Sequence, residues 1–82
     1  MNIYLLSRTE SVGYDEFDSC VVCAGSIDLA KDIHPDGRRL SKMEGNLYGS
    51  WANAPKLITA KKIGIAGDDQ EEGVILASFN AG

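Results

Sequence analysis

The distribution of apolar and polar residues along the chain predicts four short strands and one short helix. Apolar residues gather in Ile3–Ser7 and, with partial alternation and several valines, in Phe17–Ala24. Both patterns are typical of buried strands. The polar stretch between them, residues 9–16, contains Gly13 and is typical of a hairpin loop. The first part of the chain therefore predicts a β-hairpin.

A helix is predicted directly after this hairpin. Ser26 is a favourable N-cap, and Asp28 in the first turn complements the helix dipole. Three apolar residues are spaced to share one helix face: Leu29, Ala30 and Ile33. His34-Pro35 should end the helix after about two turns, because proline disfavours helical geometry in the residue before it. Such a short helix depends on docking against a sheet.

The rest of the chain predicts two more strands after a long irregular stretch, residues 36–55. A loop of this length is usually functional, or it conceals an element that the pattern misses. Lys56–Ala66 alternates as a strand, with a bulge expected near Lys61-Lys62. The polar turn Gly67–Gly73 then leads into Gly73–Phe79, a continuous apolar strand that we expect at the centre of the sheet.

The order β-β-α-β-β predicts an α+β fold, a four-stranded antiparallel sheet with one short helix packed on one face. Two antiparallel hairpins joined by the helix are the simplest arrangement. The 82 residues, 44% hydrophobic and 24% charged, have the composition of a globular chain. They suffice for one domain, residues 1–82, with a single thin core.

The charge balance limits the classes of partner. The formal net charge of −4 argues against direct nucleic-acid binding, which needs a basic surface, and favours basic protein partners. Six of the eight basic residues lie in residues 37–62, with acidic residues concentrated before and after them. This distribution predicts either surfaces of opposite sign or a scatter of solvated charges.

Two acidic clusters at expected hairpin tips are candidate partner-binding surfaces. Each could imitate a run of phosphates toward a basic groove, and the alternative for each is a plain solvated turn. The first cluster comprises Tyr14, Asp15, Glu16 and Asp18, and the second comprises Asp68, Asp69, Glu71 and Glu72. The second lacks the ligand spacing of a calcium loop, so no metal is expected there.

A basic and aromatic group in the irregular stretch is the alternative ligand-binding site. Arginine beside aromatic rings suits a phosphate, a base or a protein hot spot. A solvated loop whose aromatic rings enter the core would explain the same residues. The group comprises Arg38, Arg39, Lys42, Tyr48 and Trp51.

Catalysis is not indicated. Cys20 and Cys23 have C-x-x-C spacing, but strand alternation sends them to opposite faces with Cα atoms about 10 Å apart, too far for a disulfide. His34, the sole histidine, could cap carbonyls at the helix end and provides only a third zinc ligand. No nucleophile–base pair is available, so we expect neither an enzyme nor a cofactor.

The chain resembles a family of small uncharacterised proteins encoded by bacteriophages and prophages. The resemblance rests on segments near the start, in the middle and at the end, and the terminal Ala77–Gly82 string is its most specific part. The segments are Ile3–Leu6, Gly13–Asp15, Ser19–Ala24, Ala30 with Ile33–Pro35, Ile63–Ala66 and Gly73–Gly82. The resemblance implies a phage origin. Small acidic phage proteins are often inhibitors of host defence, including anti-CRISPR proteins, and that analogy carries no site residues.

These observations predict a non-catalytic phage protein that inhibits a host defence component through its acidic surfaces. The partner would be a host protein with a basic groove, and an exposed last strand could also pair across a two-fold axis in a homodimer. A small-ligand binder, such as a nucleotide-signal sponge using residues 38–51, is the alternative. No signal peptide or membrane span is apparent, so we expect the host cytoplasm.

Overall fold

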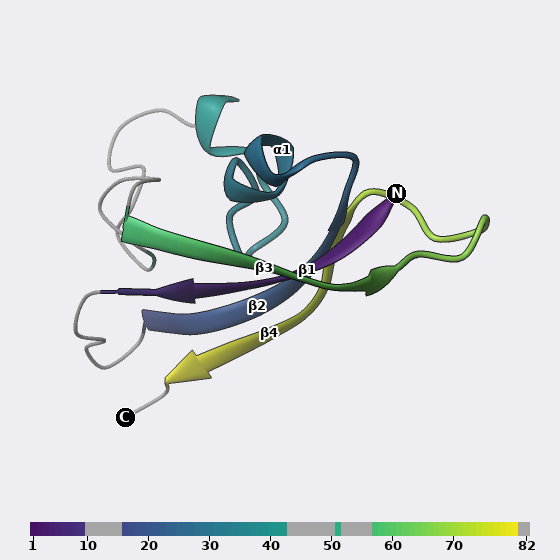
Figure 1. Ribbon diagram of the computed structural model, residues 1–82. Helices are drawn as coiled ribbons and strands as arrows, with labels where there is room; N and C mark the ends of the chain where they lie inside the picture. The colour runs from purple at the N-terminus through teal and green to yellow at the C-terminus, as the bar shows by residue number, and fades with distance from the viewer. Residues whose placement is uncertain (10–15, 43–50, 52–56, 81–82) are drawn as a thin grey trace.

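The computed structural model describes residues 1–9, 16–42, 51 and 57–80. It contains a four-stranded antiparallel sheet and one short helix (Figure 1), which confirms the predicted α+β class at that level. The elements are β1 (Asn2–Arg8), β2 (Glu16–Ala24), α1 (Ile27–Lys31), the 3-10 turn η1 (Leu40–Lys42), β3 (Ile58–Ile65) and β4 (Gly73–Asn80).

The strand order is β3-β1-β2-β4, so the first hairpin forms the centre of the sheet. The predicted second hairpin is wrong, because β3 pairs with β1 and β4 pairs with β2. The central position predicted for residues 73–79 is also wrong, since β4 is an outer edge. An apolar run indicates that the faces of a strand are apolar, and it carries no information on whether both backbone edges are paired.

The connection between β3 and β4 crosses one end of the sheet instead of forming a hairpin turn. Figure 1 shows it as a long excursion that joins the two outer strands. We call residues 67–72 the acidic arch. Its entry is fixed by a hydrogen bond from the Ala66 N–H to the Met1 carbonyl oxygen, 3.0 Å. Its exit is fixed by an ion pair between Glu72 and Arg39.

Both edge strands carry a bulge beside the same central pair. Tyr4 pairs with Lys62 and Ile3 with Gly64, which leaves Ile63 as the extra residue and confirms the bulge expected near Lys61-Lys62. On the other side of the sheet, the register shift between Val21 and Val22 leaves one extra residue in β4, namely Ile75. Bulges increase strand twist, so both edges curve at the same level of the sheet.

The core cluster draws on alternate residues of the central strands, on Ala30 of α1 and on residues that follow the helix. Figure 1 shows α1 and this turn on one side of the sheet. The buried cluster consists of Tyr4, Leu6, Cys20, Val22, Ala24, Ala30, Ile33, Leu40, Trp51 and Ile58. Leu29 was expected on the same helix face as Ala30, but it is exposed. The helix ends at Lys31, so only Ala30 and the residues after the helix turn toward the core.

The chain after α1 folds into a tight turn that the pattern did not predict. The Ser26 side chain accepts a hydrogen bond from the Leu29 N–H, 3.2 Å, which confirms the expected N-cap. Beyond the helix, the His34 N–H donates to the Arg38 carbonyl oxygen, 2.7 Å, and Ile33 forms a bridge with Arg39. Gly37 has a φ of 100°. Residues 35–37, Pro-Asp-Gly, are a typical turn sequence, and this was the available signal.

Candidate functional site

Several acidic side chains are used to hold the fold together. Glu16 accepts a hydrogen bond from Arg8 Nη1 at 3.0 Å. Asp32 accepts from the N–H and the hydroxyl of Ser41, at 2.9 and 2.8 Å. Asp36 accepts from Arg38 Nε and Nη2 at 2.8 and 2.6 Å. With Glu72 paired to Arg39, these carboxylates already have partners inside the chain.

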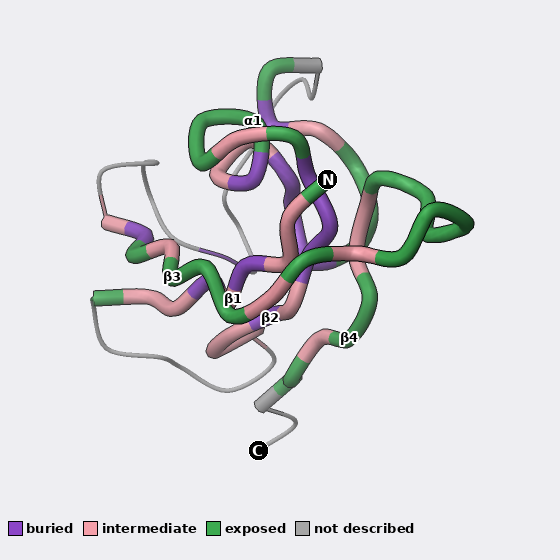
Figure 2. Tube along the Cα trace, turned by 45° about the vertical axis from the view of Figure 1, so that its right-hand side comes forward, coloured by how far each residue is buried: buried purple, intermediate pink, exposed green. Residues whose placement is uncertain are grey.

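The other three carboxylates of the acidic arch differ from these paired side chains. Asp68, Asp69 and Glu71 are exposed, and Figure 2 shows the arch exposed along its length. Within the described part of the chain, none of these three side chains makes a hydrogen bond or an ion pair. Among the described residues, the fold therefore leaves these three negative charges unpaired at one end of the sheet.

Exposed aliphatic side chains accompany this charge. Ile63 and Ile65 lie on the strand that enters the arch, and Ile65 is 74% exposed. A protein interface typically combines apolar anchors with a charged rim. We call Ile63, Ile65, Asp68 and Asp69 the arch surface, and it has the composition of a binding surface.

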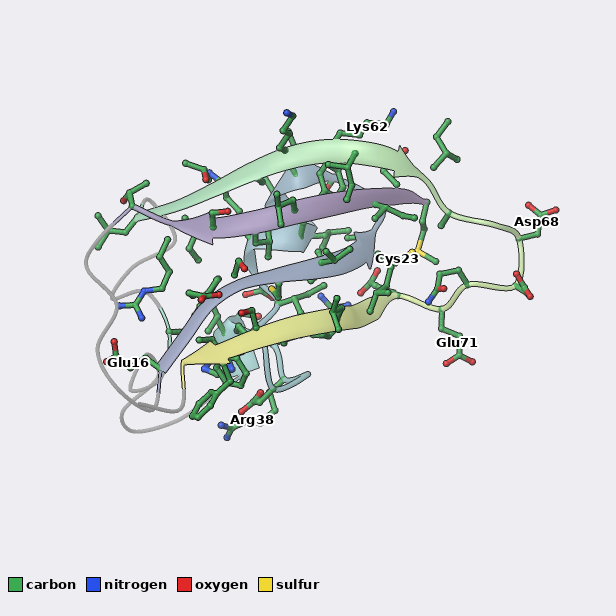
Figure 3. The ribbon with its side chains drawn as sticks, turned by 90° about the horizontal axis from the view of Figure 1, so that it is seen from below. Glu16, Cys23, Arg38, Lys62, Asp68 and Glu71 are labelled. Atoms are coloured by element: carbon green, nitrogen blue, oxygen red, sulfur yellow. The ribbon has the colours of Figure 1, made fainter. Side chains whose placement is uncertain are left out.

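The described members of the first acidic cluster, Glu16 and Asp18, lie at the other end of the sheet. Figure 3 shows Glu16 at one end and Asp68 and Glu71 at the opposite end. Glu16 is held by Arg8, and Asp18 accepts a hydrogen bond from the Ser19 hydroxyl at 3.0 Å. Tyr14 and Asp15 lie outside the described residues. Among the described residues, the structure thus places the members of the two predicted acidic clusters at opposite ends of the sheet.

The basic and aromatic group is not assembled into a site by the described residues. Arg38 is bonded to Asp36, and Arg39 contacts Asp32 at 3.9 Å as well as Glu72. Trp51 is buried in the core, as the alternative interpretation of this loop expected. The last two members of the group, Tyr48 and the side chain of Lys42, lie outside the described part.

His34 contributes to the turn that follows the helix. Its Nδ1 accepts a hydrogen bond from the Asp36 N–H at 3.0 Å, and the capping of helix carbonyls by this ring stays a prediction. The ring is buried and packs edge-on against Phe17, with centroids 5.9 Å apart. Burial lowers the pKa of His34, while the hydrogen bond from Arg38 lowers the pKa of Asp36. A neutral ring suits an acceptor Nδ1.

The two cysteines lie on opposite faces of β2, as the alternation predicted. Cys20 belongs to the core cluster, whereas Cys23 is buried outside it and pairs with Ile3 and Gly73. Both thiols are free. Burial raises the pKa of Cys20 to about 12, which leaves its thiolate essentially unpopulated at neutral pH.

No cavity is found in the described part of the chain, nor do its residues group into a candidate metal site. No helix there is long and apolar enough to cross a membrane. Comparison with protein-family models, curated proteins and solved structures finds no match to this chain. The exposed arch surface is therefore the candidate site that rests on geometry.

Proposed function

We propose that this chain is a non-catalytic binding protein whose arch surface engages a basic groove on a protein partner. The observation that carries the proposal is the sorting of the acidic residues. The fold pairs Glu16, Asp32 and Asp36 internally, while Asp68 and Asp69 stay exposed without a partner among the described residues.

The arrangement supports a protein partner over a free cation. Ile63 and Ile65 add exposed apolar area beside the carboxylates, which a hydrated ion would leave in water but a protein groove would bury. Unpaired carboxylates on a projecting arch also accelerate encounter with a positive groove through long-range attraction. Grooves of that kind commonly bind nucleic acid, so the arch would occupy the place of a phosphate run.

The proposed setting is the cytoplasm of a phage-infected cell, with a host defence component as the partner and inhibition as the outcome. This part of the proposal is supported by the sequence resemblance and by the small size and negative charge of the chain. The small-ligand alternative is weakened, because Arg39 is engaged by Asp32 and Glu72 and Trp51 is buried.

The test is a capture experiment with the purified chain as bait in a host lysate, followed by identification of the bound protein. Asp68→Lys combined with Asp69→Lys should lower the recovered partner at least about tenfold, because two attractive charges become repulsive. Heparin, used as a polyanionic competitor, should release the partner from the wild-type bait.

Asp28→Lys is the matched control, since Asp28 is an exposed acid on α1, away from the arch. It should leave recovery within about twofold of wild type. Equal recovery with the doubly substituted arch, or a partner that heparin does not displace, would contradict the proposal.

A further inference from the structure

β4 is an outer edge that lacks the usual protection against pairing with another strand. It is paired on its β2 side, and its eight residues include neither a charged residue nor a proline. The opposite edge, β3, carries Lys61 and Lys62. Charged residues, lysine above all, are a common device that blocks edge-to-edge pairing. Of the two edges, β4 is therefore the one that can pair with a further strand.

Apolar side chains on β4 are exposed where a further strand would cover them. Leu76, 68% exposed, ends a row that runs across the sheet from Leu5 through Val21. Leu5 and Val21 are partly buried and have strands on both sides, whereas no described strand lies beyond Leu76. Phe79 is exposed as well, and it contacts Phe17 at a centroid distance of 4.9 Å on its inner side.

At the two ends of β4 lie exposed side chains of opposite charge, Glu71 and Arg38, and Arg38 is also bonded to Asp36. The acidic arch precedes β4, and Figure 3 shows Glu71 on the β4 side of the arch. The other end of β4 lies beside the turn that carries Arg38, because Phe17 contacts both Phe79 and His34. The Arg38 side chain is 65% exposed. An antiparallel copy of β4 would bring the arch of one chain toward Arg38 of the other.

We propose that the chain forms a symmetric homodimer in which two β4 strands pair antiparallel across a two-fold axis. The result is a continuous eight-stranded sheet in which Leu76 and Phe79 are covered. Glu71 of each copy faces Arg38 of the other, so the symmetry produces this contact at two places. A two-fold contact of this kind is self-complementary, because the uncharged strand meets itself. The dimer is independent of the proposed function, since it uses β4, Glu71 and Arg38, none of which belongs to the arch surface.

Sedimentation equilibrium of the full chain from about 1 μM to about 1 mM tests the dimer. We expect the wild type to self-associate to twice the chain mass of 8.8 kDa. Leu76→Lys should raise the dissociation constant by roughly a hundredfold, because the symmetry brings in two lysines at once. Ile65→Lys is the matched control, as an exposed aliphatic residue on the other edge, and should leave the constant within about threefold.

Hydrogen exchange keeps the test decisive if Leu76→Lys does not fold. In the wild type, amides of β4 should gain protection as the concentration rises, while amides of β3 should not.

Arg38→Glu should weaken the dimer about fivefold, and combining it with Glu71→Arg should restore the affinity. A monomer over the whole concentration range, or association that protects β3 instead of β4, would overturn the proposal. Equal loss of association in Ile65→Lys would overturn it too.

Discussion

At the scale of single residues, His34 shows how one buried ring constrains the chain. Its Nδ1 accepts the Asp36 N–H, its ring packs on Phe17, and its backbone N–H closes the turn onto Arg38. Protonation would place a donor where an acceptor is needed. The nearby Asp36 carboxylate favours the proton and Arg38 opposes it, but desolvation is the largest effect and lowers the pKa of the ring.

This gives a prediction for the pH dependence of stability. The pKa of His34 lies below its ordinary value of 6.5, so the unfolded chain binds a proton more readily than the folded chain. The contribution of His34 to the free energy of unfolding should therefore be complete above pH 6.5. It should decrease as the pH falls below that value, by at most about 1.4 kcal/mol per pH unit.

Urea unfolding at several pH values between about 5 and 7.5 measures this dependence. His34→Gln should flatten the slope, because the titrating ring is removed. Asp36 does not contribute in that range, since its pKa is lowered from 3.8. An unchanged slope in the variant would assign the pH dependence to another group.

At the scale of elements, the turn after α1 requires a backbone conformation that favours glycine. Gly37 has a φ of 100°, in the left-handed region, and no atom lies within 4 Å of the place where a Cβ would stand. Gly64, beside the β3 bulge, has the same open space without a positive φ. The two glycines therefore separate backbone strain from steric clash.

Gly37→Ala should lower the free energy of unfolding by about 1–2 kcal/mol, because alanine is strained at a positive φ. Gly64→Ala should change it by no more than about 0.5 kcal/mol, since the added methyl meets open space. Thermal or urea unfolding of the two variants makes the comparison. Equal losses would show that the strain at residue 37 is relieved by a shift of the turn.

At the scale of the whole molecule, the buried apolar residues of the described part gather mainly in one core cluster. Leu6 is fully buried in that core, on a central strand, while its neighbour Leu5 points to the other face and is only partly buried. A chain of 82 residues has a total stability of only about 4–12 kcal/mol.

Leu6→Ala should therefore remove about 2–5 kcal/mol, a large part of the total, through lost burial and the cavity left behind. Leu5→Ala should cost less than about half of that, because less apolar area is withdrawn from water. Chemical denaturation with a far-ultraviolet signal compares the two. A larger loss at Leu5 would indicate that the second face is covered in solution, as in a larger assembly.

The sequence by itself determined the local elements of this protein. The Ser26 cap, four segments with strand character and the bulge near Lys61 were predicted from residues close together in the chain, because capping and alternation are short-range effects. The opposite faces of Cys20 and Cys23 followed from alternation alone. The Pro-Asp-Gly signal for a turn at residues 35–37 is equally local. It was missed because it lies at the start of the long irregular stretch, residues 36–55.

The tertiary structure decided everything that depends on residues far apart in sequence. Pairing of β1 with β3, and of β2 with β4, turned the expected acidic hairpin into an arch across the sheet and moved the last strand to an edge. Ion pairs such as Arg39 with Glu72 decided which charges are structural and which stay exposed. Alternation specifies the two faces of a strand, whereas its neighbours, and hence the surface it presents, are set by the free energy of the whole sheet.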